Sequence, residues 1–490
     1  MSSNKFSNRT NNWKKNDTVS IRITDVGQNG EGIGRTEDGY TIFTKNTVPG
    51  DLAEIRIVKT QKTYGFGRLM RLLEASKDRT EPFCPIAGQC GGCQLQHMTY
   101  EAELQLKENK VRNDLERIGG IVTERRTADA GSEDQADRTG NVRMEPIVGM
   151  DVNRRYRNKA QFPIGEDGQG NPVAGFYAGH SHRIIPCEDC QLGVEENREI
   201  LRAVLDWMKE QRVAAYNEET GKGIVRHVLI RKGFATGEII VCLIINAREL
   251  PRKDALIDRL SVLKGMVGIT ISSNTKKTNV IMNAPVRTIW GRGEIEDILR
   301  SEAFGVQVRY SISPASFYQV NPVQTEKIYQ KVLELADLSG TETVMDLYCG
   351  IGTISLFLAA KAAKVIGVEI VPEAIEDAKK NAAMNGIENA EFYVGKAEEV
   401  VPALYAKGAK ADVVVVDPPR KGCDQKLLDT ILQMDPGRLV YVSCDPATLA
   451  RDLKFLTANG YELKYVQPYD QFCHTVHVET CCLLEKTVVG

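Results

Sequence analysis

The sequence predicts an α/β protein whose C-terminal part, residues 306–490, folds as a doubly wound parallel sheet. Four near-continuous apolar segments of strand length alternate there with helical segments. A glycine turn, AspLeuTyrCysGlyIleGlyThr at 346–353, joins one such strand to a helix, as in nucleotide-binding sheets. A chain of 490 residues is too long for one core, so further domains are expected before this sheet.

The N-terminal part predicts a small β-barrel. Residues 1–16 are polar and are expected to form a disordered tail. Residues 17–74 alternate short β-type segments with glycine turns, a pattern typical of barrels that bind single-stranded nucleic acid. A β-domain without a ligand is the alternative. Residues 1–80 carry 14 Lys and Arg against 9 Asp and Glu, so a basic face can bind phosphates although the whole chain has a net charge of −2.

Residues 75–305 are expected to form a central α+β domain with a cysteine-rich loop. A helix is predicted over 97–120, with an apolar face that packs on the C-terminal domain. Residues 121–146 are charged and small, and we interpret them as a disordered surface insertion. The segments 226–231 and 238–246 read as paired strands.

Composition favours a cytoplasmic protein. No segment approaches the roughly 20 apolar residues that span a membrane, and the N-terminal residues lack the apolar core of a secretory signal. No obligate protein partner is evident, so we expect a monomer. The chain has 12 cysteines, and in a reducing compartment those that cluster are metal ligands or catalytic groups rather than disulfides.

Five of these cysteines have the spacing of metal ligands. Cys84, Cys90 and Cys93 lie within ten residues, and Cys187 and Cys190 follow about a hundred residues later. Two Cys-x2-Cys pairs are a familiar zinc arrangement. Three close cysteines and a distant fourth suit a 4Fe–4S cluster. Spacing leaves both open.

The glycine turn predicts a nucleotide-type ligand. Gly350 and Gly352 let the backbone bend and approach a ligand closely. Glu369 ends the next strand at the distance from which a carboxylate binds ribose hydroxyls, and Asp417 ends a later strand at the same edge. A domain that binds NAD is the alternative, although the loops around AspProPro and SerCysAsp have no evident role in hydride transfer.

Cys444 is a candidate nucleophile because it follows a strand, at the edge where α/β sites gather. A buried structural cysteine is the alternative. A thiol needs a lowered pKa to attack, and the nearby Arg420, Lys421 or Arg451 are candidates for the cation. Glu479 begins a final β-type segment and is a candidate proton acceptor.

With these motifs assembled, the chain resembles the bacterial RNA uridine-5-methyltransferases. The matching motifs are PheTyrGlnValAsn at 317–321, the glycine turn, GlyValGluIle at 367–370, AspProProArgLysGly at 417–422 and SerCysAspPro at 443–446. The resemblance implies a TRAM barrel, a Rossmann-like methyltransferase domain and a 4Fe–4S loop. It implies Cys84, Cys90, Cys93 and Cys190 as the cluster ligands, with Cys187 extra to the pattern.

The same resemblance assigns roles in the C-terminal domain. It implies that Gln319, Tyr348, Glu369 and Asp417 hold S-adenosylmethionine. It makes Cys444 the nucleophile that attacks C6 of uracil and Glu479 the base that removes the C5 proton. The basic stretch 154–161 is implied as an RNA contact.

The implied substrate is RNA. The TRAM-like barrel and the cysteine loop favour 23S rRNA, and tRNA is the alternative. A methyltransferase for cytosine C5 or for an exocyclic amine is a more distant alternative.

Overall fold

The computed structural model describes residues 13–125, 142–179, 181–277, 280–282 and 284–487. The chain divides into two compact units. The first comprises Met1–Lys107, Ala178–Ser181 and His474–Val476. The second comprises Glu108–Tyr177, His182–Cys473 and His477–Gly490. This division follows contacts, and the three domains expected from the sequence stay a prediction.

The first unit contains a closed five-stranded barrel, as the sequence predicts. Its strands follow the order β1-β2-β3-β5-β4. Inward-facing Ile42 and Ile55 are fully buried, because alternate residues of each strand turn to the core. A Cβ on Gly67 would lie 2.1 Å from Ile55, so only glycine fits there. The strands are β1 Thr18–Val26, β2 Gly32–Arg35, β3 Thr41–Thr44, β4 Leu52–Thr60 and β5 Tyr64–Glu74.

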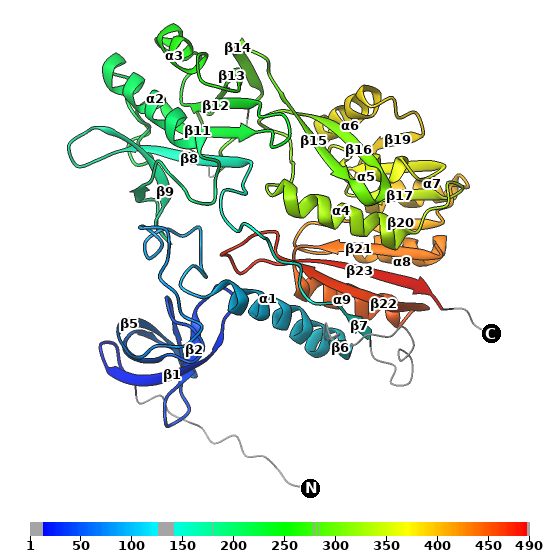
Figure 1. Cartoon of the computed structure of the whole chain (residues 1–490), viewed down its shortest axis with the longest axis horizontal. Helices are drawn as coiled ribbons and strands as arrows, with labels where there is room; N and C mark the ends of the chain where they lie inside the picture. The colour runs from blue at the N-terminus through cyan, green and yellow to red at the C-terminus, as the bar shows by residue number, and fades with distance from the viewer. Residues whose placement is uncertain (1–12, 126–141, 180, 278–279, 283, 488–490) are drawn as a thin grey trace. The chain divides into compact units, whose positions relative to one another are not determined.

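A nine-stranded sheet forms the larger part of the second unit (Figure 1). The order is β19-β18-β17-β20-β21-β23-β22-β7-β6. The five strands from β19 to β21 are parallel, as predicted, and β23 inserts antiparallel between β21 and β22. The strands are β17 Thr343–Leu347, β18 Lys364–Glu369, β19 Ala390–Val394, β20 Val413–Val416, β21 Arg438–Ser443, β22 Tyr461–Tyr469 and β23 Glu479–Lys486.

Helices cover both faces of this sheet (Figure 1). One face packs against α4 Pro322–Ala336, α5 Thr353–Ala359 and α6 Pro372–Met384. The other packs against α7 Ala397–Ala406, α8 Gln425–Met434 and α9 Pro446–Thr457. The helix predicted over 97–120 is α1 Tyr100–Asp114, continued by a π-helix at Leu115–Gly119. Val111 and Leu115 join the core under α7 to α9, which agrees with the predicted packing.

A seven-stranded sheet precedes the nine-stranded sheet in the chain, in the order β10-β9-β8-β11-β12-β13-β14. The two strands read from the sequence pair antiparallel, Val228 opposite Leu243. A hairpin of β15 and β16 follows. The elements are β8 Lys159–Glu166, β9 Pro172–Tyr177, β10 Ile184–Pro186, α2 Glu196–Gln211, β11 Val225–Lys232, β12 Ile239–Ile245, α3 Lys253–Leu260, β13 Met266–Ser273, β14 Val286–Gly291, β15 Ile295–Ser301, a 3-10 turn Glu302–Phe304 and β16 Val306–Ile312.

Parts of two segments expected to be disordered are ordered in the structure. Within 121–146, β6 Thr123–Arg125 and β7 Val142–Met144 pair with each other, and β7 extends the catalytic sheet beside β22. Pairing with a distant strand is a tertiary effect that the local composition does not reveal. Residues 126–141 and 1–12 lie outside the described residues. Trp13, in the expected tail, donates a hydrogen bond to Asp38.

Candidate active site

A cavity of about 1260 Å³ opens at the carboxyl ends of the parallel strands, where ligands bind in doubly wound sheets. It brings together the seven site residues predicted for the C-terminal domain. They are Gln319, Tyr348, Gly350, Glu369, Asp417, Cys444 and Glu479. The structure therefore gathers the predicted residues in one site, while their individual roles stay predictions.

The glycine turn between β17 and α5 forms one wall. Gly350 and Gly352 have positive φ, as expected, and so does Tyr348, at 69°. A non-glycine residue in that region is strained, and such strain gathers at ligand sites. Glu369 holds the turn, because its carboxylate accepts hydrogen bonds from the backbone N–H groups of Gly350 (3.2 Å) and Val371 (3.0 Å).

Strand register places Cys444 and Glu479 together. Ser443 at the end of β21 is the register partner of Thr480 on antiparallel β23. The next pair outward is therefore Cys444 and Glu479, although 35 residues separate them in the sequence. Both side chains line the cavity, and Glu479 is 5% exposed.

Burial and like charges raise the pKa values of the acids in this cavity. Burial raises the pKa of Glu479 to about 8, with the charge of Asp417 acting in the same direction. Burial also raises the pKa of Asp417 to about 7. Carboxylates placed close together resist full ionisation, so the site favours a proton on this pair.

The thiol of Cys444 has a raised pKa in this cavity. Burial is the largest cause, the charges of Glu479 and Asp417 add to it, and together they bring the pKa to about 12. Arg420 lowers it. Helix α9 begins just after Cys444, with Asp445 as N-cap accepting from the N–H groups of Ala447 and Thr448. Its N-terminal dipole also favours a thiolate.

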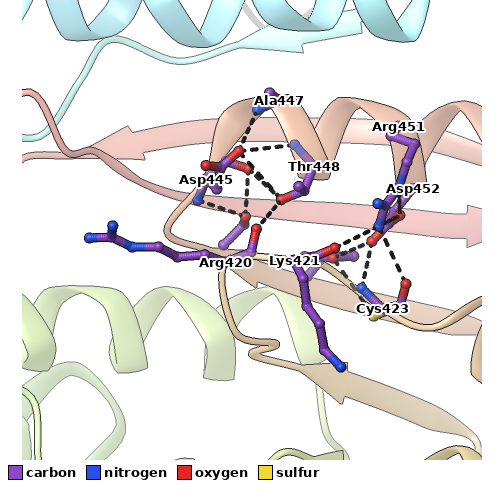
Figure 2. Close-up of polar contacts among 10 residues, drawn as sticks. Arg420, Lys421, Cys423, Asp445, Ala447, Thr448, Arg451 and Asp452 are labelled. Atoms are coloured by element: carbon purple, nitrogen blue, oxygen red, sulfur yellow. Dashed lines mark hydrogen bonds and ion pairs between the residues drawn. The ribbon is translucent and has the colours of Figure 1, made fainter. Parts of the chain in front are cut away.

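Of the three cations proposed for Cys444, the structure favours Arg420. Arg420 lines the cavity beside His477, whose ring nitrogen lies 3.4 Å from its guanidinium. Arg451 instead pairs with Asp452 at 2.7 Å. The side chains of Arg420 and Lys421 point in different directions (Figure 2). Neighbours in sequence thus have separate environments.

Sequence reasoning missed the exposed aromatic ring of the site. Phe317 lies in a motif that the sequence identified, yet its ring is 72% exposed and lines the cavity. A phenylalanine so exposed beside a polar site is suited to stacking on a flat ligand. Its motif was the available signal, but the ring's exposure depends on the loop that carries it. That loop is held where Asn158 donates to the carbonyl of Gln319 at 2.9 Å.

The basic stretch at 154–161 mainly holds the protein's own backbone. Arg155 donates to Asp189 at 2.7 Å and to the carbonyl of Cys190 at 3.0 Å. The buried Tyr156 donates to the carbonyl of Cys473. Within this stretch the exposed arginine is Arg154. The polar groups of Arg155 and Tyr156 have internal partners, and the RNA contact implied for 154–161 stays a prediction.

The predicted metal ligands fall in both units. Cys84, Cys90 and Cys93 lie in the loop between β5 and α1, where the N–H of Gly92 donates to the sulfur of Cys90 at 3.3 Å. Cys187 and Cys190 belong to the second unit. Among the described residues, no three His, Cys, Asp or Glu side chains are placed to hold a metal ion. Neither the 4Fe–4S cluster nor zinc is thus demonstrated, and no chemical step below depends on one.

Comparison with known proteins agrees with this site. The family model described as tRNA (Uracil-5-)-methyltransferase matches residues 270–487, and the TRAM domain matches residues 12–70. An "Uncharacterized RNA methyltransferase" of Halalkalibacterium halodurans is 48% identical over 96% of this chain and 97% of its own. One of Clostridium acetobutylicum is 46% identical over 96% of this chain and 98% of its own.

A solved structure shares nearly the whole fold. It is the tRNA (uracil-54, C5)-methyltransferase of Pyrococcus abyssi in complex with S-adenosyl-L-homocysteine. It is 26% identical, with a TM-score of 0.73, and the match covers 95% of this chain and 100% of that one. No helix in the described parts of the chain is long and apolar enough to cross a membrane. The chain belongs to the family of S-adenosylmethionine-dependent RNA uracil-5-methyltransferases.

Proposed function

We propose that this protein methylates C5 of a specific uridine in RNA and that this uridine lies in 23S rRNA. The reaction passes through a covalent bond between Cys444 and C6 of uracil. The observation that carries the proposal is the register of β21 and β23, which pairs a thiol with a buried carboxylate in one cavity. Uracil C5 is too weak a nucleophile to take a methyl group directly, so an enzyme must first raise its electron density.

Each step has a residue in the cavity. The thiolate of Cys444 attacks C6, and the electron pair moves to O4 as an enolate. C5 then takes the methyl group that S-adenosylmethionine supplies as a sulfonium. The carboxylate of Glu479 removes the C5 proton, the C5–C6 double bond re-forms, and the bond to Cys444 breaks. The target base has to leave its stack to reach the half-buried thiol.

The charge of the methyl donor also suits the acids of the cavity. Glu479 acts as a base only when it is ionised, yet burial raises its pKa to about 8. A sulfonium cation nearby favours the ionised carboxylates and lowers their pKa values. Donor binding and activation of the base are therefore coupled in this proposal.

The barrel offers a surface for the RNA strand. The rings of Phe43, Tyr64 and Phe66 lie on β3 and β5 with centroids 5.7 to 5.8 Å apart. Beside them Arg56 and Arg68, both exposed, are register partners across β4 and β5. We call these five residues the aromatic–basic face.

The cations of this face favour an anionic partner. Two arginines directly opposite one another destabilise a sheet unless an anion lies between them. No ion pair of Arg56 or Arg68 occurs among the residues that the structure describes, whereas Arg22 of the same barrel pairs with Glu74 at 2.6 Å. A phosphate backbone with bases stacked on the rings fits both features.

We also propose that Cys84, Cys90, Cys93 and Cys190 bind a 4Fe–4S cluster. The N–H group that donates to the sulfur of Cys90 supports a thiolate ligand there. An ultraviolet–visible spectrum of anaerobically purified protein tests this directly. Absorption in the region near 400 nm supports the cluster, and a colourless protein that contains zinc contradicts it.

The substrate is tested by mapping 5-methyluridine in rRNA and tRNA from cells that lack this protein. Loss of one position in 23S rRNA, restored by the wild-type gene and not by Cys444→Ala, is the expected result. Loss from tRNA instead supports the second candidate, which the Pyrococcus abyssi enzyme favours because its substrate is a tRNA uracil. Unchanged 5-methyluridine in both RNAs contradicts the proposal.

A further inference from the structure

The loop that carries Arg420 is attached to helix α9 by a group of polar contacts (Figure 2). The loop leaves β20 at Asp417, passes Arg420 and reaches Cys423 before α8 begins. Helix α9 starts just after Cys444. The contacts thus join the loop that bears the Arg420 cation to the helix that follows the Cys444 thiol.

Asp452 is the centre of these contacts. It is 1% exposed, and all of its hydrogen-bond partners are donors. One carboxylate oxygen accepts from the N–H of Cys423 at 2.8 Å and from the hydroxyl of Tyr441 at 2.7 Å. The other accepts from the guanidinium of Arg451 at 2.7 and 2.8 Å. The two oxygens of this carboxylate thus accept from every one of these donors.

Two further residues of α9 bind the loop's backbone. Arg451 donates to the carbonyls of Lys421 at 2.9 Å and Cys423 at 3.3 Å. The hydroxyl of Thr448 donates to the carbonyl of Arg420 at 3.1 Å. Gly422, with φ of +75°, permits this close approach, because a Cβ there would lie 2.5 Å from Arg451. Three residues of the loop, Arg420, Lys421 and Cys423, are therefore hydrogen-bonded to one helix.

We propose that Asp452 and Arg451 are positioning residues that hold the loop of Arg420 against α9 and so keep the Arg420 guanidinium beside the thiol of Cys444. Neither residue lines the cavity. This inference rests on the proposed role of Cys444. It explains why one of three neighbouring cations serves the thiol, since Arg451 is committed to the carboxylate of Asp452.

The test measures the reactivity of Cys444 without RNA or methyl donor. Iodoacetamide alkylation is followed across pH by mass spectrometry of the tryptic peptide that contains Cys444. This peptide runs from Leu439 to Arg451 in the wild type, to Lys454 in Arg451→Met and from Leu427 in Arg438→Met, and Cys444 is the one cysteine in each. The groups that set the thiol's pKa are Glu479, Asp417, Asp445 and Arg420, with His477 also facing the cavity. Because the assay needs no methylation, it stays informative even if the RNA substrate is wrong.

Asp452→Asn replaces one acceptor oxygen by an amide NH2 group, which is a donor and faces the donors that bind Asp452. The lost hydrogen bonds are expected to loosen the loop. A displaced Arg420 raises the pKa of Cys444 by about one unit. Alkylation then slows about threefold near neutral pH. A smaller fraction of the thiol is ionised, and the greater nucleophilicity of each thiolate offsets only part of that loss. Arg451→Met should slow it similarly. Arg420→Met should give the full effect, and adding Asp452→Asn to it should change nothing more.

Arg438→Met is the matched control, because Arg438 also pairs with an aspartate, Asp337 at 3.1 Å, but at the other end of β21. It should leave alkylation unchanged. The proposal is overturned if Asp452→Asn and Arg451→Met alkylate at the wild-type rate, or if their effects add fully to that of Arg420→Met. If Asp452→Asn does not fold, Arg451→Met and the near-isosteric Thr448→Val carry the test, and a wild-type rate in both overturns the proposal.

Discussion

The aromatic–basic face of the barrel and the cavity of the catalytic sheet use charge in opposite ways. On the barrel, Arg56 and Arg68 are exposed and stand opposite each other without an ion pair among the described residues. In the cavity, Asp417 and Glu479 are withdrawn from water, and burial raises both pKa values. Exposed cations bind anionic partners with an affinity that depends on salt. Buried acids have raised pKa values, and shifted pKa values of this kind are typical of groups that transfer protons in active sites.

The largest expected effect breaks the cavity's side of this comparison. Cys444→Ala should abolish methylation and remove covalent trapping by RNA that contains 5-fluorouridine, since no other group in the proposal bonds to C6. Methyl transfer to RNA and a denaturing gel measure the two outcomes. Cys242→Ala, at a fully buried cysteine of β12, is the control and should retain activity. Wild-type methylation by Cys444→Ala would rule out the covalent route.

Glu479→Gln should slow turnover by a factor of about 10² to 10⁴, the usual contribution of a general base. The amide keeps the size of the side chain but does not take the C5 proton. Methylated RNA should therefore accumulate as an adduct on Cys444. The adduct is measured with radiolabelled RNA on a denaturing gel. Rapid turnover with no adduct would assign the base to another group.

Changes on the aromatic–basic face should weaken RNA binding and leave the chemistry intact. Tyr64→Ala removes a stacking ring worth about 1–3 kcal/mol, so KM for RNA should rise roughly tenfold with kcat little changed. Arg68→Ser should reduce the slope of log affinity against log salt by about one. Arg22→Ser is the control, because Arg22 already pairs with Glu74. An equal loss in that variant would argue against this face.

The smallest expected effect is on stability. Unfolded carboxyls ionise above about pH 4.5, whereas Glu479 in the folded, unliganded protein keeps its proton up to about pH 8. The folded state binds more protons in that interval, so stability falls as pH rises through it. Glu479→Gln removes this loss and should raise Tm relative to wild type at pH 8 and not at pH 5, as measured by calorimetry.

Glu342 supplies the control of opposite sign for that measurement. Hydrogen bonds from Ser339 lower the pKa of its carboxyl to about 2. Its ionised form is therefore favoured by folding, and Glu342→Gln should not raise Tm at pH 8. A gain in both variants would indicate a general effect of removing negative charge rather than the burial of Glu479.

Local patterns explain why much of the catalytic domain was predictable. Asp445 and Pro446 mark the start of α9, because an N-cap side chain and a proline at the first turn act within a few residues. The glycine turn and Glu369 were recognised in the same way, since a βαβ unit fixes their spacing. The β-type segments of the barrel were read from alternation alone.

Features that join distant segments were not predictable. The edge strands β6 and β7 lie in a segment read as disordered, because their pairing depends on β22 more than three hundred residues away. The choice of Arg420 over Arg451 depends on Asp452, which takes the second arginine. The exposure of Phe317 depends on how its loop is held.

The sequence by itself determined the fold class, the family and the chemical character of Cys444 and Glu479, because periodicity, capping and motif spacing are local. The tertiary structure decided that these two residues line one cavity, that Arg420 lines it with them and that burial raises the pKa values of Asp417 and Glu479. Register and burial arise only when β23 inserts between β21 and β22. Proximity and desolvation belong to the packed chain, and they set the reactivity of the site.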